Sequence, residues 1–290
     1  MLTLNPITGR FGAQVEGVDL SADVSEEDLV ALKQALLDDK VLVFEGQQAM
    51  GPKQQAALAR RFGELAIHPF FPRAEEEPGI DLIRSQGWRA REAWHTDLGF
   101  DAEPNLISSL RAVDIPEVGR DTAFCDAEAV YASLSPTLQR MIEGLVGVRD
   151  WRHIFVAEEG KKGPSSTLAS KEEYARRDAM NPPREEPLVR VNPDTGRRCL
   201  NADPVFTTHI KDLAPGESAM LLRYLFDQIH YPDFQLRVRW RPGTIVMWDN
   251  RTTFHAQCFD SDHPRVMHRA IAKGRALFPE RASAPLAIAS

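Results

Sequence analysis

The chain has 290 residues, of which 43% are hydrophobic and 27% charged, a balance typical of a globular protein with its own core. This length is long for a single domain, but all-β barrels reach it, so we expect one domain over residues 1–290. The net charge of −7 is unfavourable for a nucleic-acid partner, because binding phosphates requires a basic surface. No apolar run approaches the roughly 20 residues of a membrane-spanning helix.

The cysteines and the N-terminus indicate the cellular compartment. Cys125, Cys199 and Cys258 are an odd, scattered set without a CxxC pair, which argues against a disulfide framework and against a zinc knuckle. The first residues, MLTLNPITGRFGAQ, lack the basic stretch followed by an apolar run that defines a secretory signal. We therefore expect a cytoplasmic protein with no membrane partner.

The first elements of the chain combine strands and helices. The alternating run GRFGAQVEGVDL contains turn glycines and predicts a strand or hairpin. Ser25 precedes three acidic residues, and apolar residues then recur at helical spacing, which predicts a helix over residues 25–38. The run VLVFEG at 41–46 predicts a buried strand, and a second helix is expected over residues 52–62.

From Trp94 onward the chain breaks into short strand-like runs separated by Pro, Gly, Asp and Asn. Two helices interrupt them, near Pro136–Gly144 and Glu217–His230. The second has an apolar stripe at helical spacing, made of Met220, Leu221, Tyr224, Leu225 and Ile229. Many short strands with few helices predict a mainly β protein with flanking helices, arranged as a double-sheet jelly roll.

Two segments lack the pattern of a packed element. Residues 157–187 contain few large apolar residues and several Pro and Gly, and loops of this length are usually functional or disordered. We expect this segment to be a lid loop. Residues 279–290 have the composition of a loose C-terminal tail.

Three side chains form a candidate metal site. In the run AWHTDLGF, His95 and Asp97 are two residues apart, so on an extended strand both point to one face. A distant histidine, His255, completes a set of two imidazoles and one carboxylate. This set leaves coordination positions open and is the ligand arrangement of non-haem iron(II) oxygenases. HxD alone is weak evidence, because chance produces it often and most such histidines are ordinary hydrogen-bonded residues.

The C-terminal run HPRVMHRAIAKG suggests an anion site. Arg265 and Arg269 share one strand face, and two guanidiniums side by side repel each other unless an anion lies near them. Arginine holds a carboxylate with a planar fork of donors. The alternative is a pair of solvated arginines on an edge strand.

Taken together, these motifs resemble the TauD/TfdA family of iron(II)- and 2-oxoglutarate-dependent dioxygenases. The resemblance covers nearly the whole chain and includes GAQVEGVDL, VLVFEGQ, WHTDLGF, GRDTAF, VNPDTGRRCL, MWDNRTTFHA and HRA, in the order of the family. It implies a double-stranded β-helix (a cupin-like jelly roll) with iron(II) held by His95, Asp97 and His255. It also implies 2-oxoglutarate and O2 as co-substrates.

The resemblance assigns the co-substrate site as well. Thr122 and Arg265 would hold the distal carboxylate of 2-oxoglutarate, and Arg269 would face its proximal carboxylate or the anionic end of the substrate. The family usually has two glycines before the Asp-Thr of GRDTAF. Here one of them is Arg120, so a slightly different turn is expected.

For the substrate, the run HPFFP is similar to the taurine-oxidising branch of the family, and this resemblance implies an anion contact at His68 with Phe71 beside it. Taurine enzymes of the family have tyrosine at the place of Phe71 and asparagine at the place of Arg91, and both residues serve the amine. Their replacement predicts a substrate without an amine. The further candidates for the substrate wall are Leu98, Phe155 and Phe206, of which the two phenylalanines would equally suit a packed core.

The resulting hypothesis is a dioxygenase that hydroxylates a small anionic substrate, with or without its cleavage as a consequence: a carboxylate, sulfonate, sulfate ester or aryloxyalkanoate, and not taurine. Two alternatives stay open from the residues alone. A zinc hydrolase would use the same His/Asp/His site with an activated water, and a non-catalytic module would only bind anions. Relatives are often dimers or tetramers, which predicts a homo-oligomer.

Overall fold

The computed structural model describes residues 2–69, 71–85, 94–101, 103–152 and 171–279. Within these ranges the largest sheet has eight strands in the spatial order β1-β2-β3-β14-β6-β16-β5-β4. Their bounds are β1 Thr3–Pro6, β2 Ala13–Glu16, β3 Val41–Phe44, β4 Arg73–Ala74, β5 Glu77–Ser85, β6 Asn105–Asp114, β14 Ile245–Asp249 and β16 Arg265–Lys273. All neighbours pair antiparallel except β2 and β3, which are parallel.

A smaller sheet packs against the large one. It contains β13 (Gln235–Val238), β7 (Thr122–Asp126) and β15 (Thr253–Gln257), with β7 in the middle. Apolar side chains from both sheets form one buried cluster between them, including Phe124 and Trp248, whose ring centroids are 5.3 Å apart. Two sheets around a shared core form a double-stranded β-helix, so the predicted fold class is confirmed.

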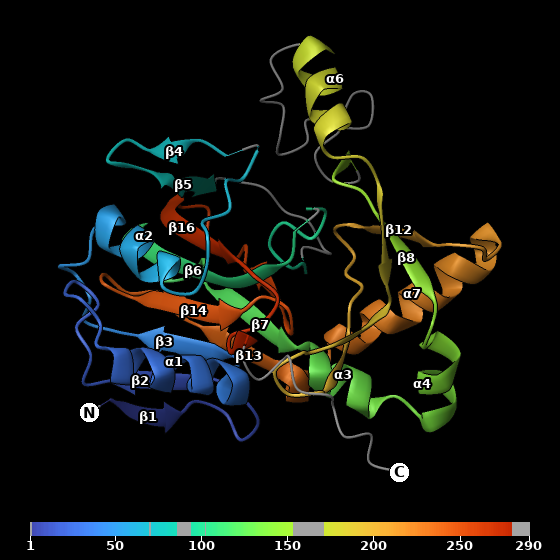
Figure 1. Cartoon of the computed structure of the whole chain (residues 1–290), viewed down its shortest axis with the longest axis horizontal. Coiled ribbons are helices and arrows are strands. Elements are labelled where there is room, and N and C mark those ends of the chain that lie inside the picture. Colours follow the sequence, from blue (N-terminus) through green and yellow to red (C-terminus); the bar gives the residue numbers. More distant parts are fainter. Residues whose placement is uncertain (1, 70, 86–93, 102, 153–170, 280–290) are drawn as a thin grey trace.

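Helices cover the large sheet on its other face (Figure 1). Helix α1 (Glu26–Asp39) begins where predicted, because the Ser25 side chain accepts a hydrogen bond from the Asp28 backbone N–H. Helix α2 (Pro52–Arg60) follows β3 and ends slightly before the predicted end at residue 62. Leu32 and Leu36 of α1 are fully buried against this face of the sheet.

The remaining elements form a second part of the molecule beside the barrel (Figure 1). A three-stranded sheet has the order β12-β8-β9, and a two-stranded sheet pairs β10 with β11. The strands are β8 Val146–Arg149, β9 Arg184–Pro187, β10 Val189–Val191, β11 Arg198–Leu200 and β12 Thr207–Ile210. The helices are α3 Ala127–Ser133, α4 Pro136–Ile142, α6 Lys171–Met180 and α7 Pro215–Ile229, followed by the 3-10 turn η1 at Pro232–Phe234.

Helix α7 corrects one prediction. Its buried face includes Leu222 as well as Leu221, Leu225 and Ile229, whereas Met220 and Tyr224 are exposed. The predicted apolar stripe therefore included two exposed residues, Met220 and Tyr224, and omitted the buried Leu222. Met220 and Tyr224 are large apolar residues on the solvent side, and periodicity alone does not separate them from the buried ones.

The predicted lid segment is only partly described. Residues 157–170 lie outside the described residues, and the rest contains helix α6 and strand β9 rather than an irregular loop. Whether residues 157–187 act as a lid stays a prediction. Of the predicted tail, only Pro279 is described.

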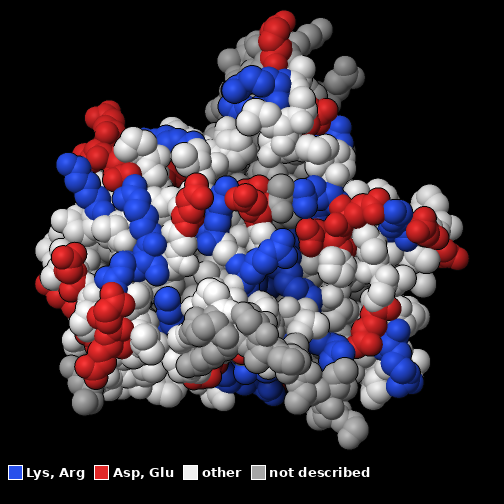
Figure 2. Space-filling model, viewed as in Figure 1, with Lys and Arg blue, Asp and Glu red and all other residues white. Residues whose placement is uncertain are grey.

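The surface carries both signs of charge. Figure 2 shows Lys and Arg side chains interspersed with Asp and Glu over the viewed face, with a small basic group near its centre. In the described part of the chain, every helix is too short or too polar to cross a membrane. The three cysteines are free thiols, and Cys125 and Cys199 are buried.

Candidate active site

The two histidines of the predicted metal site are neighbours through their backbones. His95 and His255 form an isolated antiparallel bridge, in which each backbone N–H donates to the carbonyl of the other, at 3.0 and 2.9 Å. His255 belongs to β15 of the small sheet, so this bridge attaches the HxD motif to that sheet. The two imidazole centroids are 4.2 Å apart, and both rings thus point to the same space.

Asp97 reaches this space from a turn. The prediction placed His95 and Asp97 on one extended strand, but the chain leaves the bridge and turns over residues 97–100. Asn250 fixes the turn: its side-chain oxygen accepts from the Asp97 backbone N–H at 2.9 Å, and its amide donates to the Asp97 carbonyl at 3.0 Å. The next residue, Leu98, has a positive φ of 50°, which is unusual for a side chain of this size.

The three predicted ligands meet as expected. One ligand atom from each of His95, Asp97 and His255 lies within 4.8 Å of the others, and His255 Nε2 is 3.8 Å from Asp97 Oδ1. Asp97 Oδ2 and His255 Nδ1 are buried and have no hydrogen-bond partner among the residues described. Buried polar atoms are normally paired. A divalent cation between two imidazoles and a carboxylate therefore fits this site, and the donor set suits iron(II).

A buried ion network surrounds Asp97. Arg269 Nη1 donates a hydrogen bond to Asp97 Oδ1, and the same guanidinium binds Asp81 Oδ2 through Nη2 at 2.9 Å. Asp81 lies on β5 directly across from Arg269 on β16. Asp81 was not predicted as a site residue, although a single carboxylate in the apolar strand GIDLI was a usable signal. Asp81 also pairs with Arg73, whose Nη1 lies 3.5 Å from Asp81 Oδ1, so two carboxylates meet two guanidiniums here.

The protonation of this region suits metal binding. Burial, followed by the neighbouring charge of His95, lowers the pKa of His255 well below its ordinary value, so its imidazole is neutral at neutral pH. Burial alone would raise the pKa of Asp97, but Arg269 and the two histidines outweigh it and hold that pKa well below the usual range. A neutral imidazole at His255 and an ionised carboxylate at Asp97 are the forms in which these two side chains bind a metal.

The predicted co-substrate receptor lies further along β16. Arg265 Nη1 donates to Thr122 Oγ1 at 3.1 Å and to the Arg120 carbonyl at 2.7 Å. Trp240 Nε1 also donates to Thr122 Oγ1, at 3.1 Å. Arg265 and Arg269 share the buried face of β16, as the alternation predicted. They contact different groups, however, and do not form one joint anion site.

Aromatic residues lead from the predicted substrate contacts to the metal site. The ring centroids of His68 and Phe71 are 4.4 Å apart, and the Arg269 guanidinium lies 5.0 Å from the centre of the Phe71 ring. Phe100, which the sequence analysis did not single out, lies 6.0 Å from His68 and 5.3 Å from Phe206. Phe206 in turn contacts the ring of His95 at 6.2 Å. These residues form a wall that is apolar except for His68.

The other predicted substrate residues divide into two groups. Leu98 is buried in one cluster with Phe100 and Phe206. Arg91 and Phe155 lie outside the described residues, so their predicted roles stay predictions.

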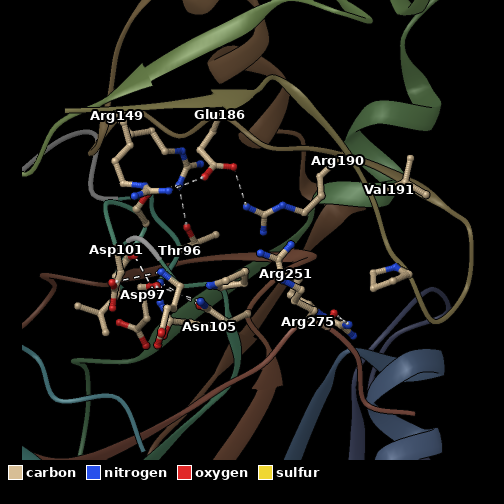
Figure 3. Close-up of a pocket in the computed structure, with 17 residues that line it drawn as sticks. Thr96, Asp97, Asp101, Asn105, Arg149, Glu186, Arg190, Val191, Arg251 and Arg275 are labelled. Carbon is tan, nitrogen blue, oxygen red and sulfur yellow. Dashed lines mark hydrogen bonds and ion pairs between the residues drawn. The ribbon is translucent and has the colours of Figure 1, made fainter. Parts of the chain in front are cut away.

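Behind the metal-bearing turn lies a polar cavity of about 350 Å³ (Figure 3). Its lining includes Asp97 and Asn105 but neither metal histidine. Arg149 extends along one side and donates to the Gly99 carbonyl at 2.9 Å and to Thr96 Oγ1 at 3.4 Å. This buried arginine therefore supports the turn from the side opposite the metal ligands.

A double-stranded β-helix with two histidines and one carboxylate at a common point defines a non-haem iron(II) oxygenase site. The family model described as taurine catabolism dioxygenase TauD, TfdA family, matches residues 3–271. The chain therefore belongs to the TauD/TfdA family and is an iron(II)- and 2-oxoglutarate-dependent dioxygenase.

Individual relatives match over most of their length. An alkylsulfatase of Acinetobacter baylyi is 32% identical over 94% of this chain and 85% of its own. The alpha-ketoglutarate-dependent 2,4-dichlorophenoxyacetate dioxygenase of Cupriavidus pinatubonensis is 31% identical over 92% and 96%. Among solved structures, a taurine dioxygenase from Burkholderia xenovorans has a TM-score of 0.78 at 30% identity, covering 94% of this chain and 89% of that one. These relatives support the dioxygenase hypothesis and not the zinc hydrolase.

Proposed function

We propose that this dioxygenase hydroxylates a small organic substrate in which a carboxylate, sulfonate or sulfate group adjoins an apolar body. The observation that carries the proposal is the contact between Arg269 and Phe71 beside Asp97, which joins a buried cation to an aromatic surface near the metal ligands. The names of the relatives, an alkylsulfatase and a 2,4-dichlorophenoxyacetate dioxygenase, support the same substrate class. A sulfate ester is our first candidate.

In this proposal the two ends of 2-oxoglutarate are held by different residues. His95, Asp97 and His255 hold iron(II) and leave positions open for the keto acid and O2. Thr122 and Arg265 bind the distal carboxylate through hydroxyl and guanidinium donors. The bound iron supplies O2 activation, by which a substrate C–H bond, O2 and 2-oxoglutarate become a C–OH bond, succinate and carbon dioxide.

Arg269 is the residue we assign to the substrate anion or to the proximal carboxylate. Its guanidinium pairs with both Asp97 and Asp81. When Asp97 serves as a metal ligand, Arg269 would be needed less as its counter-charge, so that the guanidinium would be able to turn toward an anion. Asp81 would then keep Arg269 in place during this exchange.

His68 is assigned a neutral role beside it. Burial, followed by the charge of Arg269, lowers the pKa of His68 well below its ordinary value, so it can contact an anion as a hydrogen-bond donor rather than as a cation. Phe71, Phe100, Phe206 and Leu98 would hold the apolar body and exclude water.

Phe71 has no oxygen or nitrogen to accept a hydrogen bond from an ammonium group, and the Arg269 cation already lies over its ring, which argues against taurine. The test is a succinate-release assay with iron(II) and 2-oxoglutarate, in which taurine is compared with propane-1-sulfonate, where a methyl group replaces the ammonium group. Alkyl sulfates and aryloxyalkanoates complete the series. We expect the amine-free anions to support the faster release. If taurine gives the highest rate, or if no anion stimulates succinate release, the proposed substrate class is wrong.

The cytoplasmic location and the homo-oligomer expected from the sequence stay predictions. The three free cysteines are consistent with a reducing compartment.

A further inference from the structure

Arg120 is an arginine in a place that favours glycine. It precedes β7 and has a positive φ of 61°, in the left-handed region where a side chain is disfavoured and glycine is not. Gly119 before it has a φ of 85°. The Arg120 side chain is buried at this turn, since the residue is only 1% exposed to solvent. Non-glycine residues in such a conformation cluster at functional sites.

The contacts of Arg120 connect it to the co-substrate receptor. Its carbonyl accepts the 2.7 Å hydrogen bond from Arg265 Nη1, and thereby fixes one end of that guanidinium. Its own Nε donates to the His263 carbonyl at 2.8 Å, two residues before Arg265. Its guanidinium carbon lies 5.2 Å from the centre of the Phe259 ring. Arg120 therefore touches Arg265 and the loop that leads into it.

The charges around these two arginines are not balanced. Within the described ranges neither Arg120 nor Arg265 has an ion pair, and Arg120 Nη1 and Arg265 Nε are buried without a hydrogen-bond partner. The carboxylates that flank the turn, those of Asp121 and Asp260, are both bound by Arg237. Burial, followed by the charge of Arg120, lowers the pKa of Arg265 to about 9, so Arg265 is still a cation at neutral pH.

Three guanidiniums, those of Arg120, Arg265 and Arg237, therefore lie near only two carboxylates. The buried positive charge that is left over is unfavourable unless an anion binds near it. One guanidinium with Thr122 already suffices as a fork for a carboxylate. The second positive charge thus has no explanation in the packing of the protein alone, and its location next to Arg265 identifies the anion it would serve.

We propose that Arg120 is a second cation of the distal-carboxylate receptor, which positions Arg265 through its carbonyl and selects 2-oxo acids that carry a distal carboxylate. This inference rests on the proposed role of Thr122 and Arg265. It adds Arg120 to the receptor and assigns to Arg120 the selection of keto acids that carry a distal carboxylate. The proposed role of Thr122 and Arg265 does not by itself require this selection.

The test uses Arg120→Gly and two keto acids of equal length. Glycine is compatible with the φ of this turn, so the variant loses the guanidinium while the backbone conformation is retained. 2-Oxoglutarate and 2-oxopentanoate differ only in that a methyl group replaces the distal carboxylate. Binding is measured anaerobically by the visible charge-transfer band of the iron(II)–keto-acid complex, and by calorimetry with the metal-free protein.

We expect the Kd of 2-oxoglutarate to rise about tenfold in Arg120→Gly, equivalent to about 1.4 kcal/mol. The Kd of 2-oxopentanoate should change less than about twofold, because it has no group for the lost charge to attract. Arg120→Lys, which keeps a cation, should lose less affinity for 2-oxoglutarate than the glycine variant. Arg239→Ala is the matched control, since Arg239 also donates to a backbone carbonyl but is exposed.

The outcomes distinguish a role of Arg120 in keto-acid selectivity from a role in packing alone. If both keto acids weaken equally, or neither does, Arg120 has only a packing role and the inference is wrong. Thermal unfolding of each variant shows whether a general loss of stability contributes. If the unchanged protein gives no charge-transfer band with 2-oxoglutarate, the proposed function fails and the inference with it, whereas a normal band with an unaltered Kd in Arg120→Gly refutes the inference alone.

Discussion

The start of strand β16, at Arg265, and its middle, at Arg269, differ in how their buried charges are paired. Around Arg269, the buried carboxylates of Asp81 and Asp97 pair with two guanidiniums, those of Arg269 and Arg73, and one oxygen of Asp97 is left without a partner. Around Arg265, a second guanidinium is buried nearby and no ion pair is found among the described residues. The first region has an unpartnered carboxylate oxygen, and the second has guanidinium nitrogens without a carboxylate partner. The difference indicates two neighbouring subsites, one for a metal and one for a carboxylate.

Removing a metal ligand should have the largest effect on the difference between the metal subsite and the carboxylate subsite. We expect His255→Ala to weaken metal binding by at least about 100-fold, which exceeds the usual effect of losing a residue that only supports a ligand. Calorimetric titration with manganese(II) or anaerobic iron(II) measures the change, and succinate formation should fall to background. His209→Ala, which removes an exposed histidine of β12, is the control. Unchanged metal affinity in His255→Ala would disprove the assignment of the metal site.

A smaller effect is expected from Asp81→Asn. The variant removes one of the two carboxylates that share Arg269, so the guanidinium should bind Asp97 more strongly and compete with the metal. We expect metal affinity to fall by about tenfold, within the range for residues that orient a ligand. The affinity for 2-oxoglutarate at saturating metal should change less, because Asp81 does not contact Arg265 or Thr122 in the described structure. Equal losses for metal and keto acid would mean that the two subsites are not separable.

The smallest effect is expected on the opposite face of β16, at His268. Its Nδ1 lies 2.7 Å from Arg111 Nη2, and a guanidinium can only donate, so the ring must be neutral. Burial, followed by the charge of Arg111, lowers the pKa of His268 to about 4. Because the unfolded chain takes up this proton at a higher pH than the folded one, the folded state loses stability as the pH falls from about 6.5 toward 4.

We therefore expect His268→Gln to reduce the loss of stability on acidification. Urea unfolding at about pH 7 and about pH 4.5 should give a smaller difference between the two midpoints than in the unchanged protein. The affinities for metal and 2-oxoglutarate should stay within about twofold, since this side chain points away from both subsites. An unaltered pH dependence would show that His268 is not the group responsible.

Much of this architecture follows from local patterns in the sequence. The helix after Ser25, the strand at 41–44 and the shared face of Arg265 and Arg269 were all predicted correctly, because capping and alternation are properties of neighbouring residues. The collection of His95, Asp97 and His255 was predicted from their residue types together with the family resemblance.

The rest depends on contacts between distant segments. Asp81 becomes significant only through the register of β5 with β16, and Arg120 only through the loop that places its carbonyl against Arg265. The turn at Asp97 is held by Asn250, about 150 residues away, which no local pattern encodes. Long-range pairing of this kind supplies the counter-charges that divide β16 into two subsites.

The bridge between His95 and His255 closes a loop of about 160 residues with two backbone hydrogen bonds. A metal held by both imidazoles would cross-link these distant points of the chain, much as a disulfide does, but reversibly. Ligands that bind only the folded state add about 2.7 kcal/mol of stability at 100 times their Kd. This edge of the barrel would therefore open less often as the concentration of available metal rises. The two amide hydrogens of the His95–His255 bridge would then exchange with solvent more slowly.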